Sequence, residues 1–373
     1  MQFTVKEVKS SSDLKRFIRF PHKLYSSSKQ YVPQLDTEEK SVLTKSPSLE
    51  YCTIKLWLAV YENGEIAGRI AGIHNPRANE EHGTRRIRFG WYDFVEDKAV
   101  AHGLMSMVID WGKSIGMDQI QGPLGYNTWN RQGMLVEGFE NTPPMNCLYN
   151  YPYYNDFMSE MGFEKDFDWI QLKVDASQKV PEKMVKIHDM IMEKYKLKYI
   201  NLKTLKKAER DELINSFFEE YNETFKAVEN FVPLTTAEIK DIADHYFPML
   251  KPELSSFIVD EENKVAAFSV CFPSLSEAFK KAKGRLFPFG WYHILKAYRK
   301  YDTIDFMMSG ASRKWQSKGL SSLYHVYMER SLEGRDVKWG ITNPQSEHNS
   351  AYKVWERYSN EPYMRRRCYL KKI

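Results

Sequence analysis

The sequence predicts a two-domain protein of the mixed α/β (α+β) class, in which each domain has a mixed, largely antiparallel sheet flanked by helices. The chain has 373 residues, which is enough for two domains with full cores. A hydrophobic content of 42% and an aromatic content of 14% are typical of a well-packed globular protein. One order of strand and helix patterns occurs twice, so we place the domains at residues 1–175 and 176–373.

The first half begins with a strand and two helical segments, and an antiparallel meander follows. Asn63-Gly64 between two apolar runs is a strong hairpin signal. A helix ended by Gly116, a short strand, a glycine-rich loop, a helix and a strand complete the half. The expected elements are residues 3–7, 12–20, 34–43, 54–61, 65–73, 87–95, 100–115, 118–121, 153–161 and 167–174.

The second half follows a linker at residues 175–181 and a helix near 184–195, and it repeats the same order. Its expected elements are residues 198–202, 213–225, 236–246, 256–260, 265–272, 303–309, a helix from 319, 337–342, 349–358 and 363–370. Phe289-Gly-Trp-Tyr292 matches Phe89-Gly-Trp-Tyr92 but lies in an insertion between strands. We interpret this match as a coincidence and not as part of the repeat.

Composition limits the classes of function. A net charge of +5 fits an anionic small ligand better than a nucleic acid. The chain has no apolar run of membrane-spanning length and no signal-peptide pattern, which predicts a cytoplasmic protein without a membrane partner. Its cysteines lack metal-ligand spacing, so we expect buried thiols and no metal site. They are Cys52, Cys147, Cys271 and Cys368. The oligomeric state is not indicated.

A basic, glycine-containing loop at residues 312–322 is suited to holding a phosphate. It lies between an apolar strand pattern and a helical pattern, where free backbone N–H groups and the positive end of the helix dipole meet. The alternative interpretation is a solvated basic helix start.

The order Gln316-x-x-Gly319-x-Ser321 resembles the pyrophosphate loop of the GNAT acetyltransferase superfamily, although Ser321 replaces the usual Gly or Ala. The order of elements resembles this fold over nearly the whole chain, as a tandem of two such domains. The resemblance implies that acetyl-CoA or another acyl-CoA binds the second half. The residues that would hold it are Arg313, Gln316, Ser317, Lys318, Gly319, Leu320 and Ser321. In the first half, Glu96 and Asp97 stand at the corresponding helix start and would repel a pyrophosphate.

The resemblance also implies a tyrosine acid on the last helix, but Trp355 occupies that position and Met158 occupies it in the first half. Tyr352 and Tyr358 are candidate substitutes, although tyrosines at helical spacing often belong to a core. Glu347 is a candidate base, or a helix cap.

Two further features carry polar groups. The loop of residues 122–133 combines glycines with amides and a guanidinium, and we expect it either to pack on itself or to form a ligand wall in which Asn127 and Arg131 bind the acceptor. The run of residues 365–367 predicts a solvated strand edge.

The predicted function is transfer of an acetyl or other acyl group from coenzyme A to a small amine, amino acid or peptide. One alternative is an inactive ligand-binding protein of the same fold, because neither half keeps the tyrosine. The other is a transferase that uses aminoacyl-tRNA, for which the modest charge gives no support.

Overall fold

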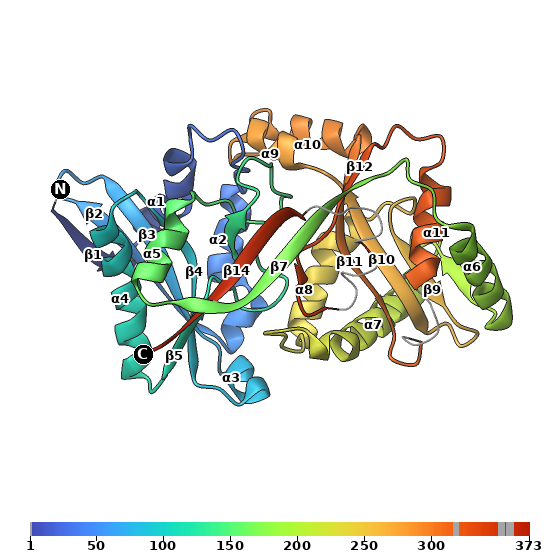
Figure 1. Ribbon diagram of the computed structural model, residues 1–373, viewed down its shortest axis with the longest axis horizontal. Helices are drawn as coiled ribbons and strands as arrows, with labels where there is room; N and C mark the ends of the chain where they lie inside the picture. The colour runs from blue at the N-terminus through green and yellow to red at the C-terminus, as the bar shows by residue number, and fades with distance from the viewer. Residues whose placement is uncertain (1, 316–320, 350–354, 356–361) are drawn as a thin grey trace.

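The computed structural model describes residues 2–315, 321–349, 355 and 362–373. Two α/β halves lie side by side, and long strands cross the junction between them (Figure 1). No helix of the described residues is long and apolar enough to cross a membrane.

The first half contains the predicted strand, helix pair, meander, helix and strands, together with two short helices and a short strand that the sequence analysis did not predict. Its elements are β1 (Phe3–Glu7), α1 (Ser11–Leu24), α2 (Asp36–Lys45), η1 (Pro47–Glu50), β2 (Thr53–Tyr61), β3 (Ile66–His74), α3 (Pro76–His82), β4 (Arg86–Phe94), α4 (Lys98–Ser114), β5 (Gln119–Gly122), β6 (Met134–Glu137), α5 (Tyr153–Glu160) and β7 (Glu164–Asp175).

The second half repeats this order, with a helical hairpin inserted between two strands of its meander. Its elements are α6 (Glu182–Lys194), β8 (Lys198–Ile200), α7 (Lys207–Thr224), η2 (Phe225–Ala227), α8 (Thr236–Tyr246), η3 (Phe247–Met249), β9 (Ser256–Val259), β10 (Val265–Pro273), α9 (Ser276–Ala282), α10 (Gly290–Arg299), β11 (Thr303–Ala311), α11 (Ser321–Leu332), β12 (Trp339–Ile341), β13 (Gln345–Ser346) and β14 (Pro362–Lys372). Apart from residue 355, the predicted helix at 349–358 lies almost entirely outside the described residues.

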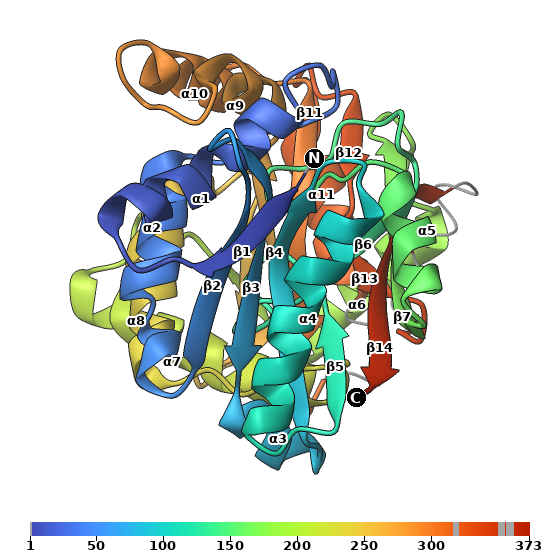
Figure 2. The ribbon, with the colours of Figure 1, turned by 90° about the vertical axis from the view of Figure 1, so that its left-hand side faces the viewer.

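Each half has three layers. In the first half, the sheet lies between α4 on one face and α1 and α2 on the other (Figure 2). In the second half, α7 and α8 cover one face with an aromatic core that includes Phe217, Phe218 and Phe268. The other face carries α6 and α11, joined by a smaller cluster around Ile191 and Leu323. The sequence-predicted fold class is therefore confirmed.

The two central strands of each half separate after a short parallel pairing. Residues 86–88 of β4 pair with 119–121 of β5, and residues 303–305 of β11 pair with 339–341 of β12. β4 then continues to Phe94 and β11 to Ala311 without that partner. The same opening is thus built twice.

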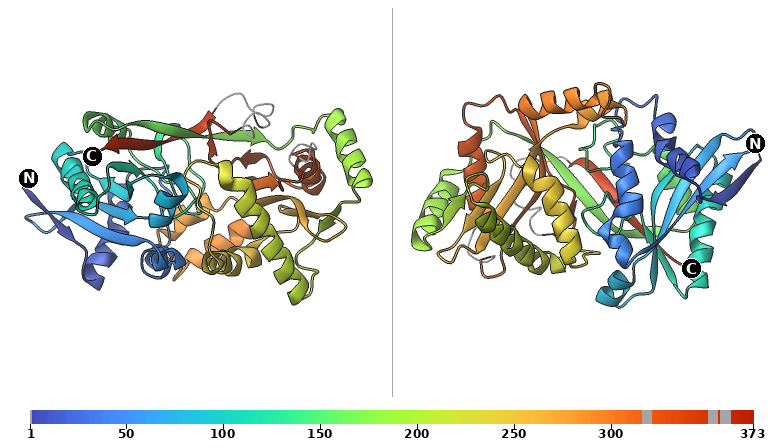
Figure 3. Two further views of the ribbon diagram at one scale, coloured as in Figure 1. Left: turned by 90° about the horizontal axis from the view of Figure 1, so that it is seen from below. Right: turned by 180° about the vertical axis from the view of Figure 1, so that it is seen from behind.

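The last strand of the chain lies in the first half. The sheet order is β1-β2-β3-β4-β5-β14-β7-β12-β11-β10-β9-β8, with β14 antiparallel to both β5 and β7. β7 in turn pairs with β12 of the second half, and the left panel of Figure 3 shows both long strands crossing the junction. The division of the chain at residues 175 and 176 stays a prediction. Strand β14 comes after this division in the sequence but pairs with strands that come before it.

The prediction of a solvated edge at residues 365–367 is wrong, because β14 is an interior strand. Arg366 is fully buried and donates to Gln171 and to the Leu148 carbonyl. Arg367 makes a bidentate contact with Asp168 of β7, at 2.8 and 3.0 Å. Burial acts to raise the pKa of Asp168, but this guanidinium outweighs it and holds the pKa below its usual value.

Asp168→Ala should lower the free energy of unfolding by about 3 kcal/mol, because it removes the buried acceptor between β7 and β14 and leaves Arg367 unpaired. The matched control is Asp118→Ala, whose partner Arg85 is exposed, with an expected cost below about 1 kcal/mol. Denaturant unfolding of both variants measures the difference, and equal costs would contradict the role assigned to Asp168.

Candidate active site

In the first half, the chain itself fills the opening between β4 and β5. The loop of residues 122–133 lies against the part of β4 that β5 has left, and the Leu124 N–H donates to the Phe89 carbonyl at 2.8 Å. A Cβ on Gly90 would lie 2.5 Å from the Leu124 carbonyl oxygen, so this close approach requires glycine. The buried Arg88 guanidinium fixes the loop by donating to two of its carbonyls, at 3.2 and 3.1 Å.

At the start of α4, the helix that follows β4, an acidic side chain already occupies two of the amide groups that a phosphate would need. The Asp97 carboxylate accepts hydrogen bonds from the N–H groups of Ala99 and Val100, at 2.9 and 3.4 Å. This capping satisfies the positive end of α4 internally. The first half is therefore ill suited to bind a pyrophosphate.

In the second half, α11 begins at Ser321 at the corresponding place. Arg313 is exposed in the turn that follows β11. Five of the predicted cofactor residues lie outside the described residues. They are Gln316, Ser317, Lys318, Gly319 and Leu320. Coenzyme A binding at this loop stays a prediction.

Asp305 is the last residue of the short β11–β12 pairing, where the opening in the second half begins. Its side chain is buried, and neither carboxylate oxygen makes a hydrogen bond of good geometry with a described residue. Burial raises the pKa of Asp305 to about 7, against a smaller opposite effect of the Ser274 hydroxyl. At neutral pH, this carboxyl group can therefore both accept and release a proton.

A cavity of about 610 Å³ lies between the halves, next to this strand. Met307 of β11 and Cys147 line it, whereas the buried Asp305 is not among the lining residues. Burial raises the pKa of the Cys147 thiol, and the charge of Asp305 acts in the same direction. Much of the remaining wall is apolar or aromatic and comes from both halves. These residues include Ile18, Tyr31, Val32, Trp129, Ile242, Tyr246, Leu275, Phe279, Leu286 and Ile294.

Both predicted acceptor-binding residues line this cavity, although their role in binding is not tested. Arg131 forms an ion pair with Glu39 of α2, and its Nη1 atom is buried without a partner among the described residues. Asn127 donates to Glu238 of α8 at 2.8 Å, so its amide is engaged in a contact between the halves.

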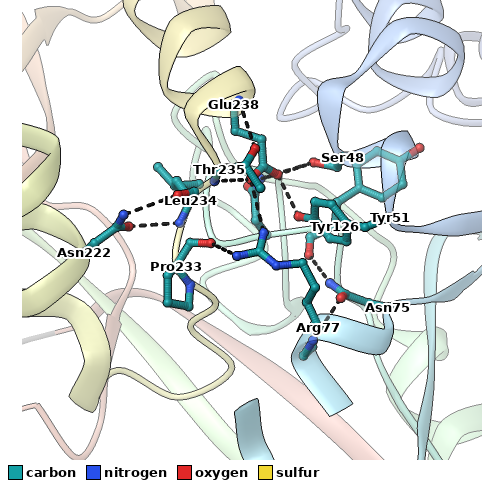
Figure 4. A network of polar contacts seen from close by, with 12 residues as sticks. Ser48, Tyr51, Asn75, Arg77, Tyr126, Asn222, Pro233, Leu234, Thr235 and Glu238 are labelled. Carbon is teal, nitrogen blue, oxygen red and sulfur yellow. Dashed lines mark hydrogen bonds and ion pairs between the residues drawn. The ribbon is translucent and has the colours of Figure 1, made fainter. Parts of the chain in front are cut away.

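Glu238 holds the two halves together. One of its carboxylate oxygens accepts from the Thr235 N–H at 2.9 Å and completes the capping box of α8. The other accepts from Ser48, Tyr51 and Asn127 of the first half, at 2.5, 2.7 and 2.8 Å (Figure 4). Arg77 lies 3.8 Å from the same carboxylate. Burial acts to raise the pKa of Glu238, but the hydrogen bonds outweigh it and lower the pKa.

Comparison with known proteins identifies the fold. No protein-family model matches the chain. It is 27% identical to Protein YghO of Escherichia coli over 387 aligned positions, which cover 100% of this chain and 96% of that protein. It is 28% identical to a bacterial ceramide synthase of Caulobacter vibrioides, covering 90% of this chain and 86% of the relative.

Solved structures of low sequence identity share the architecture. A tandem GNAT protein from the clavulanic acid biosynthesis pathway aligns with 100% of this chain and 98% of its own, at a TM-score of 0.57 and 11% identity. A GCN5-related glucosamine N-acetyltransferase region of a fungal β-N-acetylglucosaminidase aligns with 99% of this chain and 38% of its own, at a TM-score of 0.59 and 14% identity. The chain has the tandem GNAT fold.

Within this fold, Tyr352 and Tyr358 would lie on the last helix, but both are outside the described residues. Trp355, at the position where the resemblance implies a tyrosine, is buried against Phe306 and His325. Glu347 accepts from Lys165 and from the Asp168 N–H, and these contacts lower its pKa although burial acts in the opposite direction. A carboxylate engaged in this way is a weak base, and its catalytic role stays a prediction.

The sequence analysis missed Asp305 and Glu238. A signal for Asp305 was present, because it is the only charged residue within the apolar run of residues 304–308. Glu238 had the sequence of an N-terminal capping box, Thr235-x-x-Glu238, but its contacts with the first half need the fold to bring them together.

Glu238→Ala should lower the free energy of unfolding at pH 7 by about 3 kcal/mol, because the buried Ser48 and Asn127 and the half-buried Tyr51 of the first half lose their acceptor. Asp244→Ala on the exposed side of the same helix is the control, and we expect it to change the free energy of unfolding far less than Glu238→Ala does. Since the folded-state pKa is lowered from 4.5, this stabilisation is present at neutral pH and is lost as the pH falls through the folded-state value. Chemical denaturation at several pH values tests both statements.

Proposed function

We propose that the protein is an N-acyltransferase that moves an acyl group from coenzyme A to an amine. The observation that carries this proposal is the difference between the two openings of the tandem GNAT fold. The first is filled by residues 122–133, and the helix that follows its strand β4 is capped by Asp97. The second begins at the buried carboxyl group of Asp305, two residues before Met307, which lines the cavity between the halves.

Acyl transfer from a thioester to an amine needs a proton acceptor. The ammonium form must lose a proton before its nitrogen attacks the carbonyl carbon, and the sulfur leaves with the electron pair of the C–S bond. Asp305 is the proposed acceptor of that proton, because its pKa of about 7 matches neutral pH. His22 lines the cavity, but both of its ring nitrogens are used in contacts with Tyr31 and Asp36.

The wall of the cavity supports an acceptor amine that carries an apolar chain. Aromatic and aliphatic side chains such as Tyr31, Phe279 and Ile294 suit hydrocarbon, and the free Nη1 of Arg131 can donate to an oxygen of the acceptor. The name of the Caulobacter relative is in line with this proposal, since ceramides are N-acylated long-chain amines.

A ligand-binding protein without turnover is the second candidate, favoured by the buried Trp355 in the position of the expected tyrosine. Incubation with acyl-CoA thioesters of increasing chain length and with short- and long-chain amines separates the two. Release of the coenzyme A thiol together with an amide product, identified by mass spectrometry, supports the enzyme. Saturable binding of acyl-CoA without product, over the whole panel, would contradict it.

Asp305→Asn should abolish turnover yet stabilise the protein. In the wild type, the folded-state pKa is raised from 3.8 to about 7, so burial of the carboxyl group costs stability increasingly as the pH rises between these values. The variant should therefore gain stability over the wild type by about 2 to 3 kcal/mol more at pH 8 than at pH 5. Wild-type kcat/KM should rise with pH through about 7. A variant of wild-type activity would exclude Asp305 as the base.

Gly319→Asp should abolish the thermal stabilisation by coenzyme A, because it places a negative charge in the predicted pyrophosphate loop. The matched control is Ala99→Asp, at the exposed start of α4 in the first half. We expect wild-type stabilisation in this control. Loss of stabilisation in the control alone would assign the cofactor to the first half.

A further inference from the structure

The helical hairpin of α9 and α10 carries an unusual share of the exposed apolar surface. Nine large hydrophobic side chains are exposed among the described residues, and five of them lie between residues 287 and 295. They are Phe287, Phe289, Trp291, Tyr292 and Leu295, with 77%, 69%, 45%, 51% and 46% of their surface exposed. Exposed patches of this kind on a soluble fold mark interaction sites. In Figure 2, the hairpin projects beyond the layers of the sheet.

Positive charge borders this patch on both sides. Residues 278–300 include seven lysines and arginines and no acidic residue, whereas the net charge of the whole chain is only +5. The rest of the chain is therefore net negative. Six of these cations are exposed and form no ion pair with a described residue. They are Lys281, Lys283 and Arg285 before the aromatic group, and Lys296, Arg299 and Lys300 after it.

The opposite side of the hairpin is firmly attached and borders the cavity. Ser276 donates to the Pro143 carbonyl at 2.8 Å, and the Asp36 N–H donates to the Gly284 carbonyl at 2.9 Å. Leu286 and Ile294 line the cavity between the halves, and Phe287, the most exposed aromatic residue, directly follows Leu286. The apolar patch and the cavity wall thus belong to one rigid element.

We propose that the α9–α10 hairpin docks on the surface of an anionic phospholipid bilayer. Aromatic side chains enter the boundary between headgroups and acyl chains, and lysines and arginines at the sides contact the phosphates. The complementary charge favours a lipid surface over a neutral protein partner. The sequence analysis expected no membrane partner because the chain has no spanning segment, but a hairpin lying on the surface needs none. Docking would bring the cavity wall next to lipid, where amphiphilic amines reside.

Co-sedimentation with phospholipid vesicles tests the proposal without any requirement for enzymatic activity. The full-length protein should bind vesicles containing about one third phosphatidylglycerol, and high salt should release it from them. Its binding to vesicles of pure phosphatidylcholine should be at least about 10-fold weaker. Two variants of the hairpin should each lose at least about 10-fold in binding to anionic vesicles. They are Phe287→Ser/Phe289→Ser/Trp291→Ser/Tyr292→Ser and Lys296→Glu/Arg299→Glu/Lys300→Glu.

Helix α6 offers matched controls on another surface. Met190→Ser removes an apolar side chain with 57% of its surface exposed, and Lys183→Glu/Lys186→Glu/Lys194→Glu reverses three exposed charges. Both should bind like the wild type. An equal loss of vesicle binding in the α6 and hairpin variants would overturn the proposal, and so would the absence of a preference for anionic vesicles. Hairpin-dependent binding to a soluble protein, without binding to vesicles, would also overturn it. Asp305→Asn should retain vesicle binding, so failure of the proposed catalysis is distinguishable from failure of the docking.

Discussion

The antiparallel seating of β14 between β5 and β7 is the constraint on which the architecture depends. Without it, the first sheet would end at two strands with unpaired backbone groups, which is costly in a buried setting. Strand β7 belongs to the sheets of both halves, because its C-terminal residues pair with β12 of the second half. Two domains that share strands in this way cannot move as independent bodies, so the cavity between them has walls of fixed position. Glu238 reinforces the same junction through side chains.

The opening between the central strands occurs twice, and its contents differ between the halves. Both central strand pairs separate after three residue pairs, so the backbone geometry is the same in each half. What differs is the chain that follows. After β5, a loop returns into the opening, where Gly90 permits the approach and Arg88 fixes it. At the position equivalent to Arg88, the second half has Asp305, a buried carboxyl group that makes no hydrogen bond of good geometry with a described residue.

The sequence predicted the helices and turns that have local signals. It did not predict the environment of a strand whose neighbours are distant in the sequence. Asn63-Gly64, the α8 capping box and the helical periodicity of α4 are local, and the structure contains each of them. The three arginines at 365–367 looked like a solvated edge because charge in a strand usually indicates exposure. Two of their partners, the carboxylate of Asp168 and the amide of Gln171, come from a strand almost two hundred residues earlier. No pattern within the run of arginines could reveal that pairing.

The candidate site was also predicted only in part, because local sequence patterns do not show which side chains the fold buries. Sequence reasoning placed Asn127 and Arg131 together because the loop is unusual, and both reach the cavity wall. The sequence analysis did not select Asp305, because one charged residue in an apolar strand pattern does not indicate a functional site unless its side chain is known to be buried. An unpaired buried carboxyl group opposes folding, as its raised pKa shows, and such a cost persists where function requires the group. A charged residue within an apolar strand pattern is therefore a feature that sequence analysis should treat as a candidate for a functional site.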